Sequence, residues 1–216
     1  MDIKQNVINV QQNIQACQHD HERVRIVAAT KYADIKQMTQ LYESGITIMG
    51  ENRVDSFLEK KAQLTLPIEW HFIGTLQSRK VKDIINEIEV LHSLDRLSLA
   101  KEIQKYRREP LKCLIQVNIS GEDTKHGLEK NQVVSFIEQL KQFSKIEVVG
   151  LMTMAPNTSD EDVIRMCFRQ LKQLQQEIQQ NVEYCTELSM GMSNDYLLAI
   201  EEGATYVRLG SILFQN

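Results

Sequence analysis

Short apolar segments alternate with amphipathic helical segments from one end of this sequence to the other. Eight segments have the length and apolar content of buried strands, and they cover residues 25–30, 46–49, 69–73, 88–92, 112–119, 146–151, 186–190 and 205–209. Helical patterns separate them, as in residues 133–140, where apolar side chains follow i, i+3, i+4, i+7 spacing. Strands that alternate with helices predict a parallel α/β fold, and eight such units predict a (β/α)8 TIM-type barrel rather than an open sheet.

The length of the chain fits one such barrel. The sequence has 216 residues, and single α/β barrels run to ~200–250 residues. No Pro-rich or Gly-rich linker divides the chain, so we expect residues 1–216 to form a single domain. Ile3, Val7, Val10 and Ile14 form an apolar stripe before the first predicted strand, and this stripe predicts an extra N-terminal helix.

Charge and hydropathy exclude several classes of function. The net charge is −4, whereas a nucleic-acid-binding surface requires a basic stripe. No apolar run approaches the ~18 residues of a membrane span, and the N-terminus begins acidic and amphipathic, unlike a signal peptide. Cys17, Cys113, Cys167 and Cys185 have no CxxC spacing, so we expect reduced thiols packed as small core side chains in a cytoplasmic protein, and no metal site.

Glycines stand at the ends of the predicted elements. Gly45 and Gly203 each follow a helical segment and precede a strand, where the end of a helix calls for positive φ. Further glycines stand at or just beyond the carboxyl ends of predicted strands, at positions 50, 74, 150, 191 and 210. They mark either tight turns or places where the backbone approaches a ligand closely.

The first predicted strand, within RVRIVAATKYAD (residues 23–34), ends in a lysine. Strand alternation puts Val27, Ala29 and Lys31 on one face. Barrel enzymes place their active sites at the carboxyl ends of the strands, so Lys31 is expected at the mouth of the barrel. It is either a rim lysine that extends to water or a desolvated lysine with a lowered pKa, which forms a Schiff base with an aldehyde.

Two later segments resemble loops that bind phosphate. In LSMGMSND (residues 188–195) a turn leads into a helix that Ser193 or Asn194 is expected to cap. In VRLGSI (residues 207–212), Gly210 and Ser211 follow the last predicted strand. Free backbone N–H groups at such positions bind anions, and barrel enzymes often bind phosphate with the loops after strands 7 and 8.

Arg208 lies inside the last predicted strand, and alternation sends it to the opposite face from Val207 and Leu209. A buried arginine requires a partner because an unpaired buried charge is costly. That partner is either a rim carboxylate such as Glu51, in a structural ion pair, or an anion or heteroatom of a ligand.

Several motifs together resemble the pyridoxal phosphate homeostasis protein family (YggS/PROSC type). They are ATKY, GENRV (50–54), WHFIGTLQSRK (70–80), VNISGEDTKHGL (117–128), GLMTMAP (150–156), LSMGMSND and VRLGSILF (207–214), and they occur in the family's order over nearly the whole chain. The family is similar to the N-terminal barrel of alanine racemase, the fold-type III arrangement for pyridoxal phosphate.

The resemblance implies that Lys31 holds pyridoxal 5′-phosphate covalently as a Schiff base and that Arg208 lies near the pyridine nitrogen. By the same analogy the phosphate loops contain Ser189, Gly191, Met192, Ser193, Gly210 and Ser211, and the ring pocket contains Asn52, His71 and Met154. The residues alone leave simpler alternatives open for the ring pocket, namely a helix cap for Asn52, a core histidine for His71 and plain packing for Met154.

The implied function is intracellular pyridoxal phosphate homeostasis with little or no catalytic turnover. A cation facing the pyridine nitrogen disfavours its protonation, and an unprotonated ring is a poorer electron sink. The alternative is a fold-type III amino-acid racemase, but in alanine racemase the second acid/base comes from a C-terminal domain that we expect to be absent after Asn216. A sugar-phosphate barrel enzyme explains the phosphate loops but not the whole set of motifs.

The implied partners are pyridoxal phosphate and, as an open alternative, the apoenzymes that use it, with the chain as a monomer or weak dimer. The sequence departs from the family pattern near its end. Asn194 stands where the family usually has aspartate, Ser211 where it often has threonine, and the ending ILFQN where it commonly continues with FG and a short basic tail. These departures bear on phosphate affinity and not on Lys31.

Overall fold

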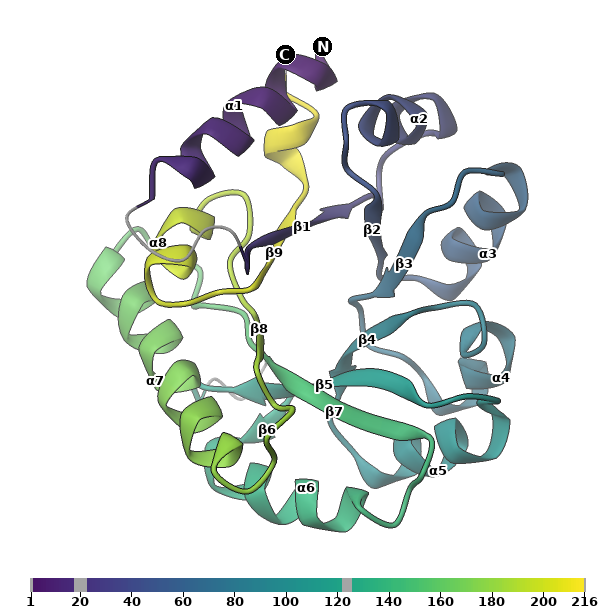
Figure 1. Ribbon diagram of the computed structural model, residues 1–216, viewed down its shortest axis with the longest axis vertical. Coiled ribbons are helices and arrows are strands. Elements are labelled where there is room, and N and C mark those ends of the chain that lie inside the picture. Colours follow the sequence, from purple (N-terminus) through teal and green to yellow (C-terminus); the bar gives the residue numbers. More distant parts are fainter. Residues whose placement is uncertain (1, 18–22, 122–125, 216) are drawn as a thin grey trace.

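Eight parallel strands form a closed barrel in the computed structural model, which describes residues 2–17, 23–121 and 126–215 (Figure 1). The barrel strands are β1 (Arg25–Ala29), β2 (Ile48–Glu51), β3 (Glu69–Phe72), β4 (Val90–Leu94), β5 (Leu111–Asn118), β7 (Ile146–Met152), β8 (Glu187–Ser189) and β9 (Tyr206–Leu209). Neighbours along the chain pair with each other, β9 pairs with β1, and the β4–β5 pairing completes the ring. The predicted (β/α)8 barrel is confirmed.

One further strand, β6 (Leu128–Glu129), adds to β5 in parallel outside the ring. The sequence did not predict it, because two residues carry no periodicity that a strand pattern could reveal. It follows residues 122–125, which belong to the 117–128 motif and lie outside the described residues.

Helices surround the barrel and return the chain to the start of each strand (Figure 1). They are α2 (Ile35–Glu43), α3 (Val54–Gln63), α4 (Val81–Ile84), α5 (Leu97–Tyr106), α6 (Val133–Leu140), α7 (Glu161–Gln179) and α8 (Tyr196–Glu201), with 3-10 turns η2 (Ser78–Lys80), η3 (Lys130–Gln132) and η4 (Ser211–Leu213). Asp34 starts α2 in a capping box with Gln37, in which each side chain accepts from the other's backbone N–H. This box fixes the direction in which the chain leaves the loop after β1.

The predicted N-terminal helix is α1 (Ile3–Gln15), and its apolar stripe is buried. In Figure 1 it lies beside α8 and the last segment of the chain, with both termini at the same edge of the molecule. Nδ2 of Asn6 donates to the backbone oxygens of Leu213 (3.2 Å) and Gln215 (2.9 Å). The helix therefore holds in place the segment that follows the loop after β9.

The barrel wall separates two hydrophobic layers. On β1, Val27 points into the barrel, whereas Ala28 faces the surrounding helices. The inner layer comprises Val27, Ile48, Val90, Leu114, Val149, Met152 and Tyr206. Because alternate residues of a strand share a face, Ala29 follows Val27 on the inner side, and Arg208 follows Tyr206. The predicted inner face is confirmed for Val27 and Ala29, and Lys31 lies beyond the end of the strand.

Glycine positions separate into two groups. Gly45 and Gly203 have φ of 92° and 98° at helix ends, as predicted. Gly50 and Gly150 lie within β2 and β7, near their carboxyl ends, so the tight-turn alternative does not apply to them. A Cβ at Gly150 would lie 2.0 Å from the backbone oxygen of Glu187, so this glycine allows β7 and β8 to pack together.

Two smaller expectations need correction. The apolar spacing of Val163, Cys167, Leu171, Leu174 and Ile178 predicts a buried stripe on α7, but Val163 is 42% exposed and the stripe begins at Ile164. Cys17 is partly exposed, whereas the other three cysteines are buried. In the part of the chain that the structure describes, none of the helices has both the length and the apolar character needed to cross a membrane.

Candidate functional site

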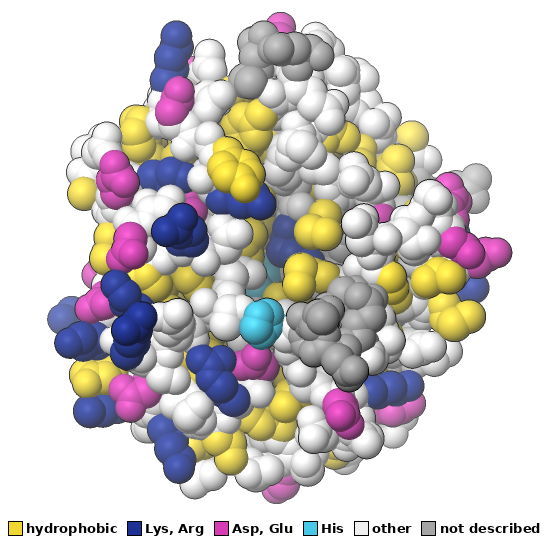
Figure 2. Space-filling model, turned by 180° about the vertical axis from the view of Figure 1, so that it is seen from behind, with side chains coloured by type: hydrophobic (Ala, Val, Ile, Leu, Met, Phe, Trp, Pro, Cys, Tyr) yellow, Lys and Arg dark blue, Asp and Glu magenta, His cyan; other side chains and the backbone are white. Residues whose placement is uncertain are grey.

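A cavity of about 820 Å³ opens at the carboxyl ends of the strands. Its walls come from the loops after β1, β2, β3, β7, β8 and β9, together with the start of α7 and the end of the chain. Figure 2 views the molecule from the side opposite to Figure 1 and shows a hollow near the centre of this face, with Lys and Arg side chains inside it and hydrophobic side chains around it. The size is typical of a small-molecule site.

Most of the predicted site residues meet at this cavity. The members of the predicted set that line it are Lys31, Asn52, Met154, Met192, Ser193, Arg208, Gly210 and Ser211. They come from strand β9 and from the loops after β1, β2, β7, β8 and β9, and closure of the barrel brings them together. His71, Ser189 and Gly191, also in the predicted set, are not among the lining residues.

Lys31 stands two residues beyond the end of β1 with an exposed side chain. Its Nζ lies 4.6 Å from the centre of the Tyr32 ring, a cation–π distance. Tyr32 itself is 87% exposed and lines the same cavity. The amine is therefore accessible at the mouth of the barrel.

The backbone before Lys31 is held from the outside of the barrel by a buried ion pair. Nζ of Lys60, on α3, lies 2.6 Å from Oε1 of Glu51 and donates to the backbone oxygen of Thr30 at 2.5 Å. The hydroxyl of Thr30 donates to the same carboxylate oxygen at 2.6 Å. The ends of β1 and β2 are thus tied to α3 beside the lysine.

This arrangement corrects the ion pair considered for Arg208. Glu51 faces outward to Lys60, so it is not the partner of the inward-facing Arg208. Nη1 of Arg208 donates to Oγ of Ser189 at 2.6 Å, and its Nη2 donates to the backbone oxygen of Thr153 at 2.9 Å. Burial lowers the pKa of Arg208 to about 10, against a smaller opposite effect of Asp195. The guanidinium stays charged at neutral pH and forms the buried inner side of the cavity.

The loops after β8 and β9 are joined through one hydroxyl. Oγ of Ser193 accepts hydrogen bonds from the backbone N–H groups of Gly210 (3.1 Å) and Ile212 (3.3 Å). A serine hydroxyl has one proton and two acceptor sites, so the Ser193 proton is left to donate. Gly191 has φ of 93°, and a Cβ there would lie 2.6 Å from Cβ of Ala199, so only glycine fits this turn without strain.

The predicted cap of the following helix is wrong. Asp195, rather than Ser193 or Asn194, occupies the N-cap position of α8. Oδ1 of Asp195 accepts from the backbone N–H of Met192 at 2.6 Å, so it closes the turn instead of capping the helix. Burial raises the pKa of this carboxyl. Asn194 lines the cavity.

Asn52 directly follows β2, and the loop after β3 packs against it. A Cβ at Gly74 would lie 2.4 Å from Cβ and from the backbone oxygen of Asn52. Gly74 is therefore required for this close approach. The helix α3 starts after Arg53 without a side-chain cap, so the capping role considered for Asn52 is not present.

The three remaining predicted residues lie deeper. His71 and Ser189 are fully buried inside the barrel, below the cavity. Oγ of Ser189 contacts Arg208 and Nδ1 of His92, so it supports the arginine from beneath instead of forming part of the upper loop. Gly191 shapes the turn without lining the cavity.

Comparison with known proteins agrees with this geometry. Residues 5–216 match the family described as alanine racemase, N-terminal domain. The pyridoxal phosphate homeostasis protein of Aquifex aeolicus is 40% identical over 88% of this chain and 86% of its own, and that of Pasteurella multocida is 35% identical over 99% and 97%. The chain belongs to the pyridoxal phosphate homeostasis protein family. The resemblance seen in the motifs is confirmed.

Solved structures of similar chains support this family membership. PipY of Synechococcus elongatus, solved with PLP bound, is 29% identical and has a TM-score of 0.88, covering 99% of this chain and 100% of its own. An alanine racemase of Clostridium difficile has a TM-score of 0.80 at 15% identity and covers 98% of this chain and 57% of its own, which shows a shared fold-type III barrel.

Several residues of this site were not predicted from the sequence. Thr153, whose backbone oxygen holds Arg208, and His92, which contacts Ser189, were not among the candidates. His92 could have been found, because a histidine inside an otherwise apolar predicted strand is an unusual polar residue in a core. Asn157 and Thr158 line the cavity from the loop after β7, where polar residues carry no distinctive spacing.

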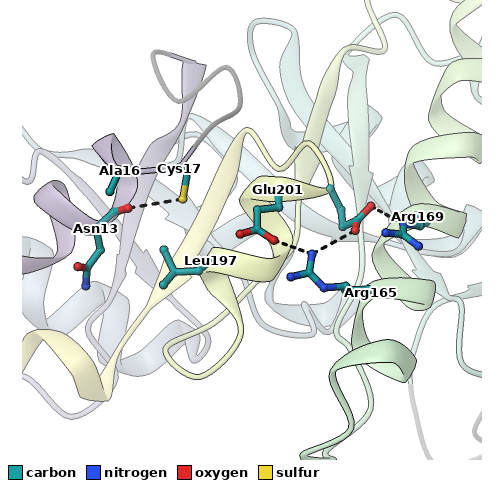
Figure 3. A pocket seen from close by; sticks show the side chains of 8 residues that line it. Asn13, Ala16, Cys17, Arg165, Arg169, Leu197 and Glu201 are labelled. Carbon is teal, nitrogen blue, oxygen red and sulfur yellow. Dashed lines mark hydrogen bonds and ion pairs between the residues drawn. The ribbon is translucent and has the colours of Figure 1, made fainter.

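A second, more open groove lies between α1, α7 and α8 (Figure 3). Its charged side chains pair with each other. Arg165 lies 2.6 Å from Glu201, and Arg169 lies 2.8 Å from Glu202. The pairs join α7 to α8, the helix that follows the loop after β8, and so this groove has a structural role next to the site.

Proposed function

We propose that this chain binds pyridoxal 5′-phosphate in the cavity at the mouth of the barrel, in Schiff-base linkage to Lys31, and acts in pyridoxal phosphate homeostasis with little or no turnover. The observation that carries the proposal is the convergence of Lys31, two hydroxyl-bearing loops and the buried Arg208 on one cavity of about 820 Å³. The family relatives bear the homeostasis name, and PipY was solved with PLP bound.

The residues present fit the chemistry of this cofactor. Pyridoxal phosphate supplies an aldehyde, which condenses with a primary amine with loss of one water, and Lys31 offers an accessible amine at the cavity. The hydroxyls of Ser193 and Ser211, with the backbone of the two loops, offer neutral donors for a phosphate. Asn52 and Met154 would then line the ring.

Arg208 would face the pyridine nitrogen. It is buried, held at both Nη atoms, and charged at neutral pH. A guanidinium can only donate hydrogen bonds, so it favours a nitrogen that keeps its lone pair. An unprotonated ring withdraws electrons less strongly, and this supports a role in holding the cofactor rather than in amino-acid chemistry.

The tyrosine positions favour carriage over racemisation. A two-base racemase needs an acid/base across the ring from the lysine. The hydroxyl of Tyr196 accepts from Asn13 of α1 at 3.2 Å, and Tyr206 lies in the inner layer of the barrel. Tyr32 lies on the same loop as Lys31, with its ring beside Nζ.

We further propose a cytoplasmic location, with residues 1–216 acting as one domain. None of the four cysteines, all of which lie in the described residues, forms a disulfide, which suits a reducing compartment. Apoenzymes that take up the aldehyde are the partner class that a homeostasis role implies.

The test is reduction of the protein with borohydride after incubation with pyridoxal phosphate, followed by tryptic peptide mapping. A pyridoxyl group on Lys31 blocks cleavage there, so the labelled peptide should span residues 26–36. Lys31→Ala should lose both the label and the absorption band of the bound aldehyde, while its circular dichroism stays unchanged. The matched control is Lys36→Ala, an exposed lysine of α2, which should keep the absorption band.

Two outcomes would contradict the proposal. A label that lies on another lysine of the wild-type protein would refute the linkage. Racemisation of single L-amino or D-amino acids by wild-type protein, lost in Lys31→Ala, would establish the enzyme alternative in place of a carrier.

A further inference from the structure

A continuous line of side-chain hydrogen bonds crosses the barrel interior beneath the cavity. Nη1 of Arg208 lies 2.6 Å from Oγ of Ser189, which lies 2.8 Å from Nδ1 of His92. Nε2 of His92 lies 2.9 Å from Nδ1 of His71, and Nε2 of His71 lies 3.0 Å from Oε1 of Glu69. Glu69 is the first residue of β3, so the line ends at the opposite end of the barrel from the cavity.

The members of this line differ sharply in exposure. Ser189, His71 and His92 are 0% exposed, and Arg208 is 5% exposed. The side chain of Glu69 is 41% exposed. The line therefore connects a solvent-accessible carboxylate to a buried guanidinium through three side chains that bulk solvent does not reach.

The chemistry of the two ends fixes every proton along the line. A carboxylate only accepts hydrogen bonds, so the proton between Glu69 and His71 is on Nε2 of the histidine. A neutral imidazole with a proton on Nε2 has an acceptor at Nδ1, so Nε2 of His92 must donate to it. Nδ1 of His92 is then an acceptor in turn.

The remaining steps agree with the other end of the line. Because Nδ1 of His92 accepts, the hydroxyl of Ser189 must donate to it. The lone pairs of that hydroxyl are then available to Arg208, which can only donate. Thus all four hydrogen bonds run in one direction, from the guanidinium to the carboxylate, and bonds that run in one direction strengthen one another.

Both histidines have to be neutral for the line to persist, since a charged imidazole donates from both nitrogens. Burial lowers the pKa of His71 and lowers that of His92 well below its usual value. The hydrogen bond from His71 lowers the pKa of Glu69, so this carboxyl is ionised at neutral pH. The protonation states of Glu69, His71 and His92 therefore match the proton positions derived from geometry.

We propose that Glu69, His71, His92 and Ser189 are positioning residues for Arg208. The carboxylate of Glu69, at one end of the barrel, sets the direction of the hydrogen bonds. The hydrogen bond at the other end of the line, from Nη1 of Arg208 to Oγ of Ser189, fixes the guanidinium at the cavity. The consequence for the cofactor rests on the proposed function, in which Arg208 faces the pyridine nitrogen. The electronic state of the bound ring would then depend on a residue at the far end of the barrel.

The first test needs no cofactor. Two-bond ¹H–¹⁵N spectra of the imidazoles at pH 7 should show His71 and His92 each as a single neutral tautomer with the proton on Nε2. Glu69→Leu removes the terminal acceptor from a half-exposed position, and both histidines should then lose the single tautomer. Finding an Nδ1–H tautomer or a charged imidazole in the wild-type protein would overturn the positioning role.

The second test uses the protein loaded with pyridoxal phosphate. Glu69→Leu should shift the absorption maximum of the bound cofactor while Lys31 remains the labelled residue. The matched control is Tyr206→Phe, because the Tyr206 ring packs 5.3 Å and 5.4 Å from the two imidazole rings without belonging to the line. It should leave the absorption maximum unchanged.

The two tests separate the possible failures. An unchanged absorption maximum in Glu69→Leu, with label on Lys31, would overturn the positioning role while leaving the proposed function intact. Absence of label from wild-type Lys31 would refute the proposed function, and the imidazole spectra would still decide the line of hydrogen bonds.

Discussion

Lys60 is the cation that pairs with the buried Glu51, and the loss of stability on removing it can be estimated from the structure. The Glu51 side chain is 0% exposed and that of Lys60 is 12% exposed, so Lys60→Met leaves a buried carboxylate without its cation. Breaking a buried pair on one side costs about 3–5 kcal/mol. Thr30 and Ser56 still donate to the carboxylate, at 2.6 and 3.3 Å, so we expect a loss toward the lower end, about 3 kcal/mol.

The loss can be measured by thermal and urea unfolding at pH 7. A destabilisation of 1 kcal/mol lowers Tm by roughly 2–4 °C for a chain of this size, so about 3 kcal/mol corresponds to a decrease of roughly 6–12 °C. The matched control is Lys61→Met, at the next position of α3. Its partner Glu87 lies at 3.2 Å, with side chains 34% and 48% exposed, and such surface pairs contribute about 0–1 kcal/mol.

A second substitution separates the charge from the packing. Glu51→Gln in the Lys60→Met background removes the unpaired charge and should recover part of the lost stability, because the amide costs less to bury than a carboxylate. The ion-pair explanation is wrong if Lys60→Met loses no more stability than Lys61→Met. It is also wrong if the double variant is less stable than Lys60→Met alone.

Two further predictions concern the turn after β8 and the buried histidines. Gly191→Ala should lower the free energy of unfolding by about 1–3 kcal/mol, because a φ of 93° is strained for alanine and the new Cβ would lie 2.6 Å from Cβ of Ala199 in α8. The measurement is urea unfolding. The control is Gly45→Ala, which should lose less stability because Gly45 has a similar φ of 92° but no atom within 4 Å of the new Cβ. Burial lowers the pKa of His71 and His92 in the folded state below 6.5, so as the pH falls these histidines are protonated in the unfolded chain before they are protonated in the folded one. The free energy of unfolding that depends on them should therefore be constant above about pH 6.5. Below that pH it should fall by up to about 1.4 kcal/mol per pH unit for each histidine. Urea unfolding between pH 7.5 and 5 should show a shallower slope in His92→Gln, and equal slopes would contradict this.

The positions of the strands could be predicted from the local apolar pattern, and the position of the site could be predicted from the general geometry of barrels. The apolar run of residues 25–30 and the polar residues that follow it have the length and composition of a buried strand that ends at a rim. Because the carboxyl ends of all barrel strands meet at one face, Lys31 and the loops around residues 193 and 210 were expected to converge. The cavity brings them together although they are far apart in sequence.

The sequence-based predictions were wrong where they depended on which face of a strand a residue occupies or on its height along the barrel axis. Glu51 was considered as the partner of Arg208, but it follows the inward-facing Gly50 and so faces outward to Lys60. Ser189 was placed with the phosphate loop, but it is the last residue of β8 and lies one layer below. Alternation gives the face of a strand, whereas height along the barrel axis depends on the stagger between strands.

The hydrogen bonds that support Arg208 could not be inferred from any local pattern. His92 and Ser189 are 97 residues apart, and their hydrogen bond depends on the closed ring of strands. Each histidine taken alone resembles a satisfied core histidine. Only the pairing of β3 with β4 puts His71 and His92 within hydrogen-bond distance.

The two polar networks act on opposite sides of the same barrel wall. Glu51 and Lys60 fix the backbone next to Lys31 from the outside, while Ser189 and the histidines hold Arg208 from the inside. Rigid supports of this kind reduce the ordering that a ligand must induce on binding, and this raises affinity without any new contact. Under the proposed function, a site in which the backbone next to Lys31 and the guanidinium of Arg208 are both held in advance would suit retention of an aldehyde cofactor more than the repeated rearrangement of a substrate.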